Sequence, residues 1–240
     1  MRLNVPVPTS ALAIAAHPDD VEFGAGGTLA AWAAAGCVVH HLVLTDGAKG
    51  TWDLEADPVA LAATRQVEQR EAARRLGATG EVRFLGRTDG TLEADLATRT
   101  EVARVIRELR PEAVLGHDPW RRYRLHPDHR AAGWLACDAE VMAREPHFDV
   151  AGLEAWRPSL LLLWEADEPD LLVDVTAHVD AKLDALLAHE SQWGPTMDVF
   201  DPTDEAAIER FRRRVREKLA TWGRQVGVPY AEAFKLIDNL

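Results

Sequence analysis

Apolar and polar positions alternate along this chain in a way that separates strands from helices. Six short apolar runs are typical of strands buried on both faces of a sheet. They are Ala11–Ala16, Val38–Thr45, Val82–Leu85, Ala113–Gly116, Ser159–Trp164 and Leu171–Val175. Segments with helical periodicity or Ala-rich composition lie between and after them, at Gly26–Ala35, Pro58–Leu76, Leu96–Leu109, Pro127–Ala143, Val179–His189 and Thr203–Ala220. The alternation predicts an α/β fold of parallel βαβ units, with helices on both faces of a mostly parallel sheet.

Two regions are less regular than the rest. Leu171–Val175 could run antiparallel, and the tail from Gly227 shows only a short mixed pattern. No internal repeat or low-complexity tract divides the chain. Because α/β domains often reach 240 residues, we expect one domain that spans residues 1–240.

Three polar segments follow predicted strands directly. They are Asp46–Asp57, Gly86–Asp95 and His117–Leu125. The carboxyl ends of parallel strands meet at one edge of a sheet, where open α/β sheets place their ligand sites. We therefore expect these segments to converge near His17, which follows the first strand.

Two short motifs, about a hundred residues apart, carry the candidate chemistry. They are His17-Pro18-Asp19-Asp20 and His126-Pro127-Asp128-His129. In each motif the first and fourth residues can share a face at the start of a helix, because residues three apart are neighbours there. A catalytic zinc takes about three protein ligands and keeps one position for water. The simplest ligand set is His17, Asp20 and His129, which would also suit Fe2+.

Two further groups remain beside such a metal, and hydrolysis needs both. Asp19 would accept a proton from the attacking water, and His126 would stabilise the oxyanion or protonate the leaving group. Two neutral imidazoles and one carboxylate would leave the metal site at a charge of about +1, which favours a developing oxyanion. Asp128 could orient His126 or His129.

Other interpretations of these motifs are weaker. One motif alone could be a helix start with acidic residues that complement the helix dipole. The glycines of Gly24–Ala30 superficially resemble a dinucleotide fingerprint, which would indicate a nucleotide-binding oxidoreductase. That fingerprint needs its first glycine directly after the strand, whereas Gly24 comes eight residues after Ala16. A non-catalytic sugar-binding protein would have no use for Asp19 as a base.

Composition excludes several partners. With 27 basic and 39 acidic residues, the formal net charge of −12 argues against nucleic acid or an anionic membrane. No apolar run approaches the ~20 residues of a membrane-spanning helix. Two isolated cysteines form no disulfide framework and fit a reducing, cytoplasmic environment. Pro6 and Pro8 interrupt the only signal-like segment, so we expect no cleaved leader. The oligomeric state, including a homo-oligomer, stays open.

The two histidine motifs resemble those of the PIG-L/LmbE-like family of metal-dependent N-deacetylases. Further features agree: Gly24 with the pair Gly26-Gly27, Thr45-Asp46-Gly47, Arg65 and Glu68 with Leu76-Gly77, Phe84-Leu85-Gly86 followed by Asp89-Gly90, Lys182 with His189-Glu190-Ser191-Gln192, and Tyr230 to Phe234. The resemblance spans about Leu12 to Phe234. It implies a single Rossmann-like domain that hydrolyses an acetamide, commonly on an N-acetylglucosamine unit.

The resemblance also implies roles for individual residues. Zn2+ would be bound by His17, Asp20 and His129, with Asp19 as the general base and His126 as the group that polarises the carbonyl or acts as the acid. Substrate contacts would come from Arg65, from Asp89 through a sugar hydroxyl, and from His189 near the pocket.

Residues outside the motifs could add substrate contacts. Arg124, with Arg121 and Arg122, could bind an anionic part of the substrate or simply form a solvated loop. Trp52 and Trp120 lie in loops at the expected edge and could stack on a sugar ring. Core positions are expected for Trp32, Trp134, Trp164 and Trp222. His117 ends a predicted strand and could support the metal ligands.

We therefore predict a metal-dependent hydrolase that deacetylates an N-acetylated amino sugar or its conjugate. The alternative within this class is an amidase acting on a larger sugar–thiol conjugate or an antibiotic-type intermediate. The alternative from another class is the nucleotide-binding oxidoreductase.

Overall fold

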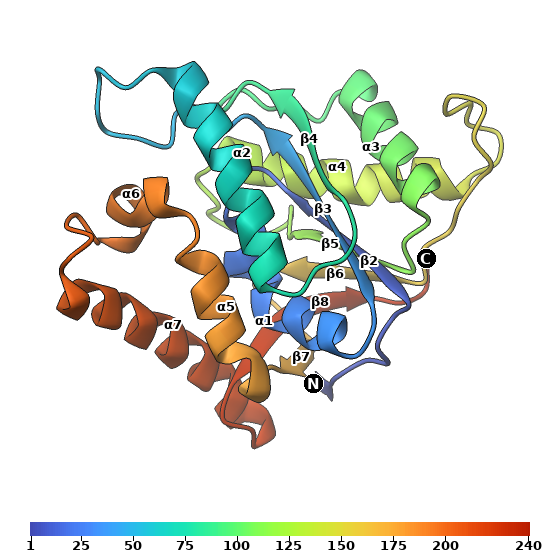
Figure 1. Ribbon diagram of the computed structural model, residues 1–240. Helices are drawn as coiled ribbons and strands as arrows, with labels where there is room; N and C mark the ends of the chain where they lie inside the picture. Colours follow the sequence, from blue (N-terminus) through green and yellow to red (C-terminus); the bar gives the residue numbers. More distant parts are fainter.

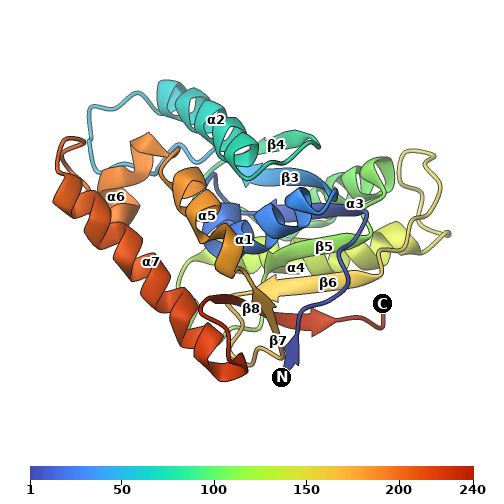
Figure 2. The same ribbon diagram turned by 60° about the horizontal axis from the view of Figure 1, so that its bottom comes forward.

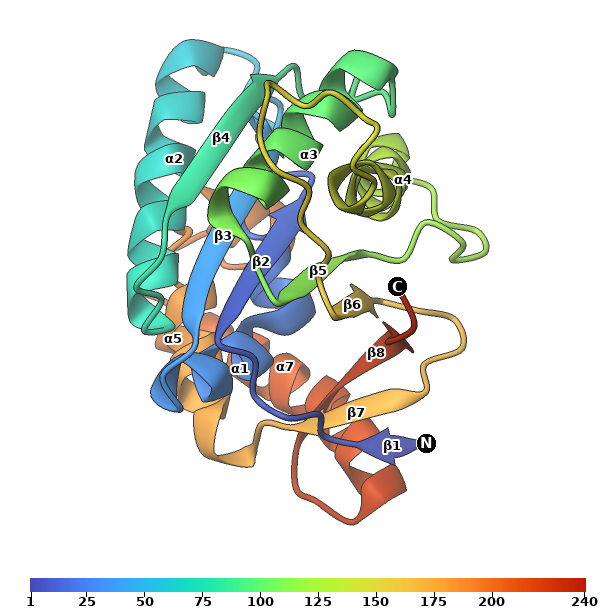
Figure 3. The same ribbon diagram turned by 90° about the vertical axis from the view of Figure 1, so that its right-hand side faces the viewer.

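A twisted eight-stranded sheet runs through the protein, with helices on both of its faces (Figures 1, 2 and 3). The computed structural model describes all residues, 1–240. The strands are β1 (Arg2–Leu3), β2 (Ser10–Ala15), β3 (Val38–Thr45), β4 (Val82–Arg87), β5 (Ala113–His117), β6 (Leu160–Trp164), β7 (Leu171–Asp174) and β8 (Ala231–Ile237). The helices are α1 (Asp20–Ala34), α2 (Pro58–Arg75), α3 (Leu96–Leu109), α4 (Pro127–Arg144), α5 (Val179–Leu186), α6 (Trp193–Met197) and α7 (Glu205–Val226).

The strand order is β1-β7-β8-β6-β5-β2-β3-β4. All neighbouring strands pair in parallel except at β8, which is antiparallel to both β6 and β7. The mostly parallel α/β architecture is therefore confirmed. None of the helices combines the length and apolar composition that crossing a membrane requires.

The hydrophobic core is divided by the sheet into two layers. On β2, alternate residues such as Ala13 pack toward α1, where Leu29 and Trp32 belong to the same cluster. The residues between them, such as Ile14, pack in a second cluster that includes Ile106 of α3 and Leu135 of α4. Figure 3 shows α1, α2 and α5 on one side of the sheet and α3 and α4 on the other. A strand buried on both faces carries the continuous apolar run that the sequence shows.

The structure adds β1 and α6, which the sequence did not predict, and it differs from the prediction at α1 and β8. Helix α1 begins at Asp20 rather than Gly26, directly after β2. Its amphipathic pattern is weak because it is covered by the sheet on one side and by α5 on another, so most of its residues are buried. The tail predicted as short and mixed forms β8, whose buried Glu232 breaks the expected apolar pattern.

The sequence allows an antiparallel orientation for the strand Leu171–Val175. Strand β7 does pair antiparallel with β8, but it runs parallel to β1. Since β6 is also antiparallel to β8, β7 runs in the same direction as the main body of the sheet.

A buried ion pair links α1, α5 and β8 on one face of the sheet. The ammonium of Lys182 donates to Glu232 at 2.6 Å and to the carbonyl oxygens of Glu22 and Phe23 at 2.8 and 2.9 Å. Glu232 in turn accepts from the backbone N–H groups of Gly27 and Thr28 at 2.9 and 2.7 Å. Each side chain is only 3% exposed, so every polar atom of this pair has been transferred from water to a protein partner.

Replacing Lys182 with Met should therefore destabilise the fold strongly. Removing one member of a buried, hydrogen-bonded pair leaves the other charge uncompensated and costs about 3–5 kcal/mol. Urea unfolding followed by circular dichroism measures this loss. The matched control is Arg2→Met, which breaks the exposed Arg2–Asp238 pair at 3.1 Å and should cost less than about 1 kcal/mol. An equal loss of stability in the two variants would contradict this account of the buried Lys182–Glu232 ion pair.

Candidate active site

The carboxyl ends of the central parallel strands meet over a cavity of about 480 Å3. His17 follows β2, Asp89 follows β4 and His117 ends β5, while Asp20 and His129 lie in the first turns of α1 and α4. The sequence predicted this convergence, and the structure brings both histidine motifs to the same cavity. Its polar lining residues include His17, Asp19, Asp20, Arg65, Asp89, His117, His126 and His129.

Asp20 lies at the centre of this cluster. Its Oδ2 accepts from the backbone N–H of His17 at 2.7 Å and lies 3.2 Å from Nε2 of His117. Its Oδ1 lies 3.3 Å from Nε2 of His129. Burial opposes ionisation, but the interactions with His129 and His117 outweigh it and hold the pKa of Asp20 well below its usual range. Asp20 is therefore a carboxylate whose Oδ1 faces an imidazole nitrogen.

Two carboxylates fix the orientation of His17. Its Nε2 lies 3.1 Å from Oδ1 of Asp89 and 3.2 Å from Oδ2 of Asp128, while Nδ1 lies 3.4 Å from Asp20. Burial lowers the pKa of His17, but hydrogen bonds with Asp128, Asp20 and Asp89 outweigh it and raise the pKa to about 12. A carboxylate that holds the outer nitrogen of a histidine, leaving the inner one for a cation, is the usual arrangement at protein metal sites.

The hydrogen bonds of His117 place a proton on Nε2, toward Asp20; burial lowers the pKa of His117, but the charge of Asp20 outweighs it and raises the pKa. The indole N–H of Trp164 donates to Nδ1 of His117 at 2.9 Å, and Arg124 lies 3.1 Å from the same nitrogen. Both of these groups are donors only, so Nδ1 must be the acceptor and Nε2 must carry the proton. That proton points at Asp20, so His117 has no free lone pair on the metal side.

The remaining imidazoles are aligned at the cavity mouth. The ring of His129 stacks between those of His126 and His117, at centroid distances of 4.5 and 4.4 Å. Burial lowers the pKa of His129 to about 4, and burial together with the charge of His17 lowers the pKa of His126. Both rings are therefore neutral at pH 7, and neutral imidazole is the form that ligates a metal.

The donor set fits a divalent metal. Ligand atoms of His17, His126 and His129 lie within 4.8 Å of one another, as do those of Asp20, His117 and His129. Imidazole nitrogens combined with a carboxylate oxygen suit zinc and ferrous iron. The proton on Nε2 of His117 excludes this residue as a ligand, which leaves Asp20 and His129 with His17 or His126.

Asp19 is buried next to this cluster and is 5% exposed. Burial raises its pKa to about 6, since the opposing charge of Arg65 compensates only in part. Its backbone has a φ of 98°, a left-handed conformation that costs energy in a residue with a side chain, and its N–H donates to Gln69 at 2.9 Å. A carboxyl group with a pKa near neutrality is suited to exchange protons with a substrate.

Arg65 ties the loops around Asp19 together. Its guanidinium donates to the carbonyl oxygens of Gly47 and Pro18 at 2.7 and 2.6 Å and lies 3.4 Å from Oδ2 of Asp19. Arg65 lines the cavity while being only 3% exposed. It supports the candidate base from one side and can still contact a ligand at the edge of its guanidinium.

A buried polar network lies behind Asp19. Glu22 accepts from Nε2 of Gln69 at 2.8 Å and lies 3.2 Å from Nε2 of His189 and 3.7 Å from Nδ1 of His41. Gln69 thus connects the backbone of Asp19 to Glu22. The family resemblance implied a position near the pocket for His189, but the structure buries it completely within this network, away from the cavity lining.

Three other residues make contacts that differ from the predicted ones. Asp128 holds His17 instead of His126 or His129, and it also accepts from the backbone N–H groups of Gly90 and Leu92. Arg124 is buried and bonded to His117 and to Glu165 at 2.8 Å, so its charge is already used within the protein. Trp120 packs edge-on against Trp134 and lines a separate depression.

Sequence reasoning missed several residues of the site. The sequence does not indicate a role for Gln69 in the site, because a glutamine inside a helical pattern has no characteristic chemistry. Glu165 follows β6 as the polar segments follow other strands, and that position could have identified it. Of the tryptophans expected in the core, Trp164 and Trp32 are buried, whereas Trp134 is exposed and Trp222 is half-buried. The indole N–H of Trp164 also fixes the tautomer of His117.

Comparison with known proteins agrees with the motifs. The family model described as PIG-L, GlcNAc-PI de-N-acetylase, matches residues 12–140. Diacetylchitobiose deacetylase of Thermococcus kodakarensis is 33% identical over 233 residues, which cover 95% of this chain and 83% of that protein. The solved N,N'-diacetylchitobiose deacetylase of Pyrococcus horikoshii superimposes with a TM-score of 0.85 at 30% identity, covering 96% of this chain and 84% of that one.

One relative has a different named activity. The 4-oxalmesaconate hydratase of Pseudomonas putida is 31% identical over 192 residues, which cover 74% of this chain and 71% of that protein. The family model nevertheless covers more than half of the present sequence and includes both histidine motifs. The protein therefore belongs to the PIG-L family of N-deacetylases.

Proposed function

We propose that the protein hydrolyses the acetamide of an N-acetylated amino sugar or its conjugate, with Asp19 as the general base. The observation that carries the proposal is the position of Asp19. It is a buried carboxyl group with a pKa of about 6, adjacent in sequence to Asp20 and lining the same cavity as the imidazole cluster. Relatives whose names specify deacetylation of amino sugars support this substrate class.

A divalent metal would be held by His17, Asp20 and His129, where it would polarise the amide carbonyl and acidify a water molecule. We propose zinc as this metal, with ferrous iron as the alternative. The three residues supply one carboxylate and two imidazoles. The imidazole of His129 is already neutral, and that of His17 must lose a proton to bind the metal. Asp89 and Asp128 hold His17 from behind, and His117 holds Asp20, so the ligands are oriented before a cation arrives.

The chain's own groups account for the proton transfers. Asp19 takes a proton from the attacking water as its oxygen approaches the amide carbonyl carbon. His126 is exposed at the cavity mouth and can hydrogen-bond the carbonyl oxygen as negative charge develops there. The protonated Asp19 then delivers its proton to the leaving nitrogen, and the C–N bond breaks to give a free amine and acetic acid, which ionises to acetate. Arg65 limits the mobility of the Asp19 carboxylate throughout.

The nucleotide-binding alternative is not supported by this geometry. A dinucleotide places its pyrophosphate at the N-terminus of the helix that follows the first strand of the unit. Here that position carries the carboxyl groups of Asp19 and Asp20, both less than 10% exposed. Two buried acids would repel a pyrophosphate. An amidase acting on a larger sugar conjugate uses the same chemistry and differs only in what surrounds the amide.

Substitution of the candidate base separates chemistry from metal binding. Asp19→Asn should lower the turnover rate by about 10² or more, because the general base is lost, while the metal content stays unchanged. Asp20→Ala should instead remove the metal. Release of primary amine from N-acetylglucosamine derivatives and metal analysis by mass spectrometry measure the two effects, with Asp184→Asn as the control, an exposed carboxylate outside the cavity lining. Full metal content in Asp20→Ala would contradict the ligand assignment.

The relative named as a hydratase suggests a second activity to measure in the wild-type protein and in Asp19→Asn. If the wild-type protein hydrates an unsaturated dicarboxylate and releases no amine from any acetylated sugar, the proposed deacetylation is wrong. Loss of that hydration in Asp19→Asn would still identify the same base.

Metal binding should release a proton. The cluster of Asp20, Asp89 and Asp128 keeps His17 protonated in the metal-free protein, where its pKa is raised to about 12. A cation must displace this proton, so zinc titration at pH 7 should release about one proton per site, and affinity should rise as pH rises. Calorimetry in buffers of different ionisation enthalpy measures the release. Zinc binding at pH 7 without proton release would contradict the assignment of the proton to His17.

A further inference from the structure

The peptide unit between Pro18 and Asp19, here called the 18–19 peptide, is held by hydrogen bonds at both of its polar atoms. Arg65 donates to its carbonyl oxygen at 2.6 Å, and its N–H donates to Oε1 of Gln69 at 2.9 Å. Arg65 and Gln69 are four positions apart on α2, so they lie on the same face of that helix. Two side chains of α2 therefore fix the plane of this one peptide.

The plane of the 18–19 peptide determines where the side chain of Asp19 points. The φ angle of Asp19 is 98°, in the left-handed region that costs energy in a residue with a side chain. Rotation of the 18–19 peptide would relieve this strain, but it would exchange the directions of its C=O and N–H. The N–H would then leave Gln69 and turn toward the guanidinium of Arg65, which has donors only. The two α2 side chains thus stabilise a backbone conformation that Asp19 would not adopt by itself.

Gln69 can accept from the 18–19 peptide because the other end of its amide is already fixed. Its Nε2 donates to Oε1 of Glu22 at 2.8 Å and lies 3.1 Å from Nδ1 of His41. A carboxylate is an acceptor only, so the amide nitrogen must face Glu22 and the amide oxygen must face Asp19. Gln69, Glu22 and His41 are each 0% exposed, so bulk water does not compete for this amide.

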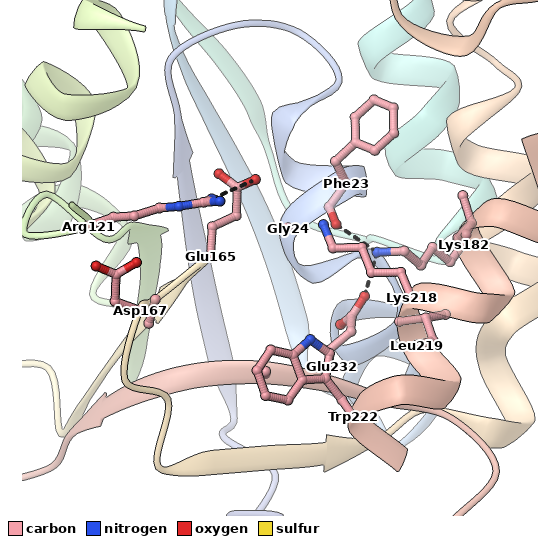
Figure 4. A pocket seen from close by; sticks show the side chains of 13 residues that line it. Phe23, Gly24, Arg121, Glu165, Asp167, Lys182, Lys218, Leu219, Trp222 and Glu232 are labelled. Carbon is pink, nitrogen blue, oxygen red and sulfur yellow. Dashed lines mark hydrogen bonds and ion pairs between the residues drawn. The ribbon is translucent and has the colours of Figure 1, made fainter. Parts of the chain in front are cut away.

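Glu22 is itself held in place by the elements around it. Its Oε2 lies 3.2 Å from Nε2 of His189, and its carbonyl oxygen accepts from Lys182 at 2.8 Å. Figure 4 shows the ammonium of Lys182 directed at the carbonyl oxygen of Phe23, one residue further along α1. Glu22 is thus a fixed acceptor, and Gln69 links it to the 18–19 peptide.

We propose that Gln69 is a positioning residue, which holds the 18–19 peptide and thereby directs the carboxyl group of Asp19 toward the attacking water. This inference rests on the proposed function, in which Asp19 is the general base. A base acts only from the correct position, and a displacement of about 1 Å can lower a rate by about 10². Gln69 does not line the cavity. Its loss should therefore slow the chemical step without removing a group that touches the substrate.

The same network is less well suited to carry protons to Asp19. Gln69 contacts the backbone N–H of Asp19 rather than its carboxyl group, and a side-chain amide does not exchange charge near neutral pH. The hydrogen bonds of His41 and His189 lead to Gln69 and Glu22, and neither imidazole bonds the Asp19 carboxyl. The network therefore acts on the orientation of Asp19.

Gln69→Leu removes the amide and keeps a side chain of similar size. It should lower kcat for amine release by about tenfold or more, with KM and metal content unchanged. In the Asp19→Asn protein, which already lacks the base, the same substitution should cause no further loss. The matched control is Gln66→Leu, the same change on α2 outside the cavity lining, which should leave kcat unchanged. A change confined to KM, or an equal loss in the Asp19→Asn protein, would overturn the proposal.

An exchange of two side chains tests the same orientation if Gln69→Leu folds poorly. Gln69→Glu alone places two carboxyl groups 2.8 Å apart and should lower kcat. Adding Glu22→Gln restores one donor and one acceptor between these positions, and it leaves a carboxylate oxygen to accept from the N–H of Asp19. The double variant should therefore recover most of the lost kcat. A folded, metal-loaded double variant that stays as slow as Gln69→Glu would overturn the proposal.

Hydrogen exchange at the Asp19 amide separates this inference from the proposed function, because it needs no turnover. Measured by NMR, Gln69→Leu should speed this exchange by about tenfold relative to the amide of Leu29 in the core of α1. If the wild-type protein releases no amine but this relative change is present, deacetylation is wrong and the hold on Asp19 stands. If amine is released but both amides exchange faster to the same extent, or neither changes, the positioning role is wrong.

Discussion

The negative charge of Asp20 is the constraint on which the rest of the site depends. One of its oxygens accepts from the backbone of His17 and from His117, and the other faces His129. These three histidines come from the ends of β2 and β5 and from the start of α4, so a single carboxylate connects two strands and two helices. Burying a carboxylate is costly unless it is paired, and here each partner also fixes the orientation of a ring.

The same principle explains why the supporting residues are so many. His17 would be free to rotate without Asp89 and Asp128, and His117 could exchange its proton between nitrogens without Trp164 and Arg124. Each of these partners removes one alternative arrangement of a ligand or of its neighbour. The carboxylates around His17 outnumber its positive charge, which makes the cavity attractive to a divalent cation before any is bound.

The architecture and the histidine cluster could be predicted from the sequence because their signals are local. Buried strands produce apolar runs, and the motifs at His17 and His126 place their residues three apart at the ends of predicted strands. The sequence predicts too late a start for α1, because a helix covered on several sides has little periodicity of apolar and polar residues. Strand β8 was missed, because its buried Glu232 is compensated by Lys182, which lies 50 positions earlier in the chain.

The substrate contacts were harder to predict for a related reason. Arg124 and His189 carry the right chemistry for a ligand, but the protein uses both internally, and only the fold shows which polar groups are already satisfied. Lys182 shows the same for a lysine. Its ammonium has three acceptors within 2.9 Å, all from the protein, so every donor of this cation is used to hold α1, α5 and β8 together and none is left for a ligand.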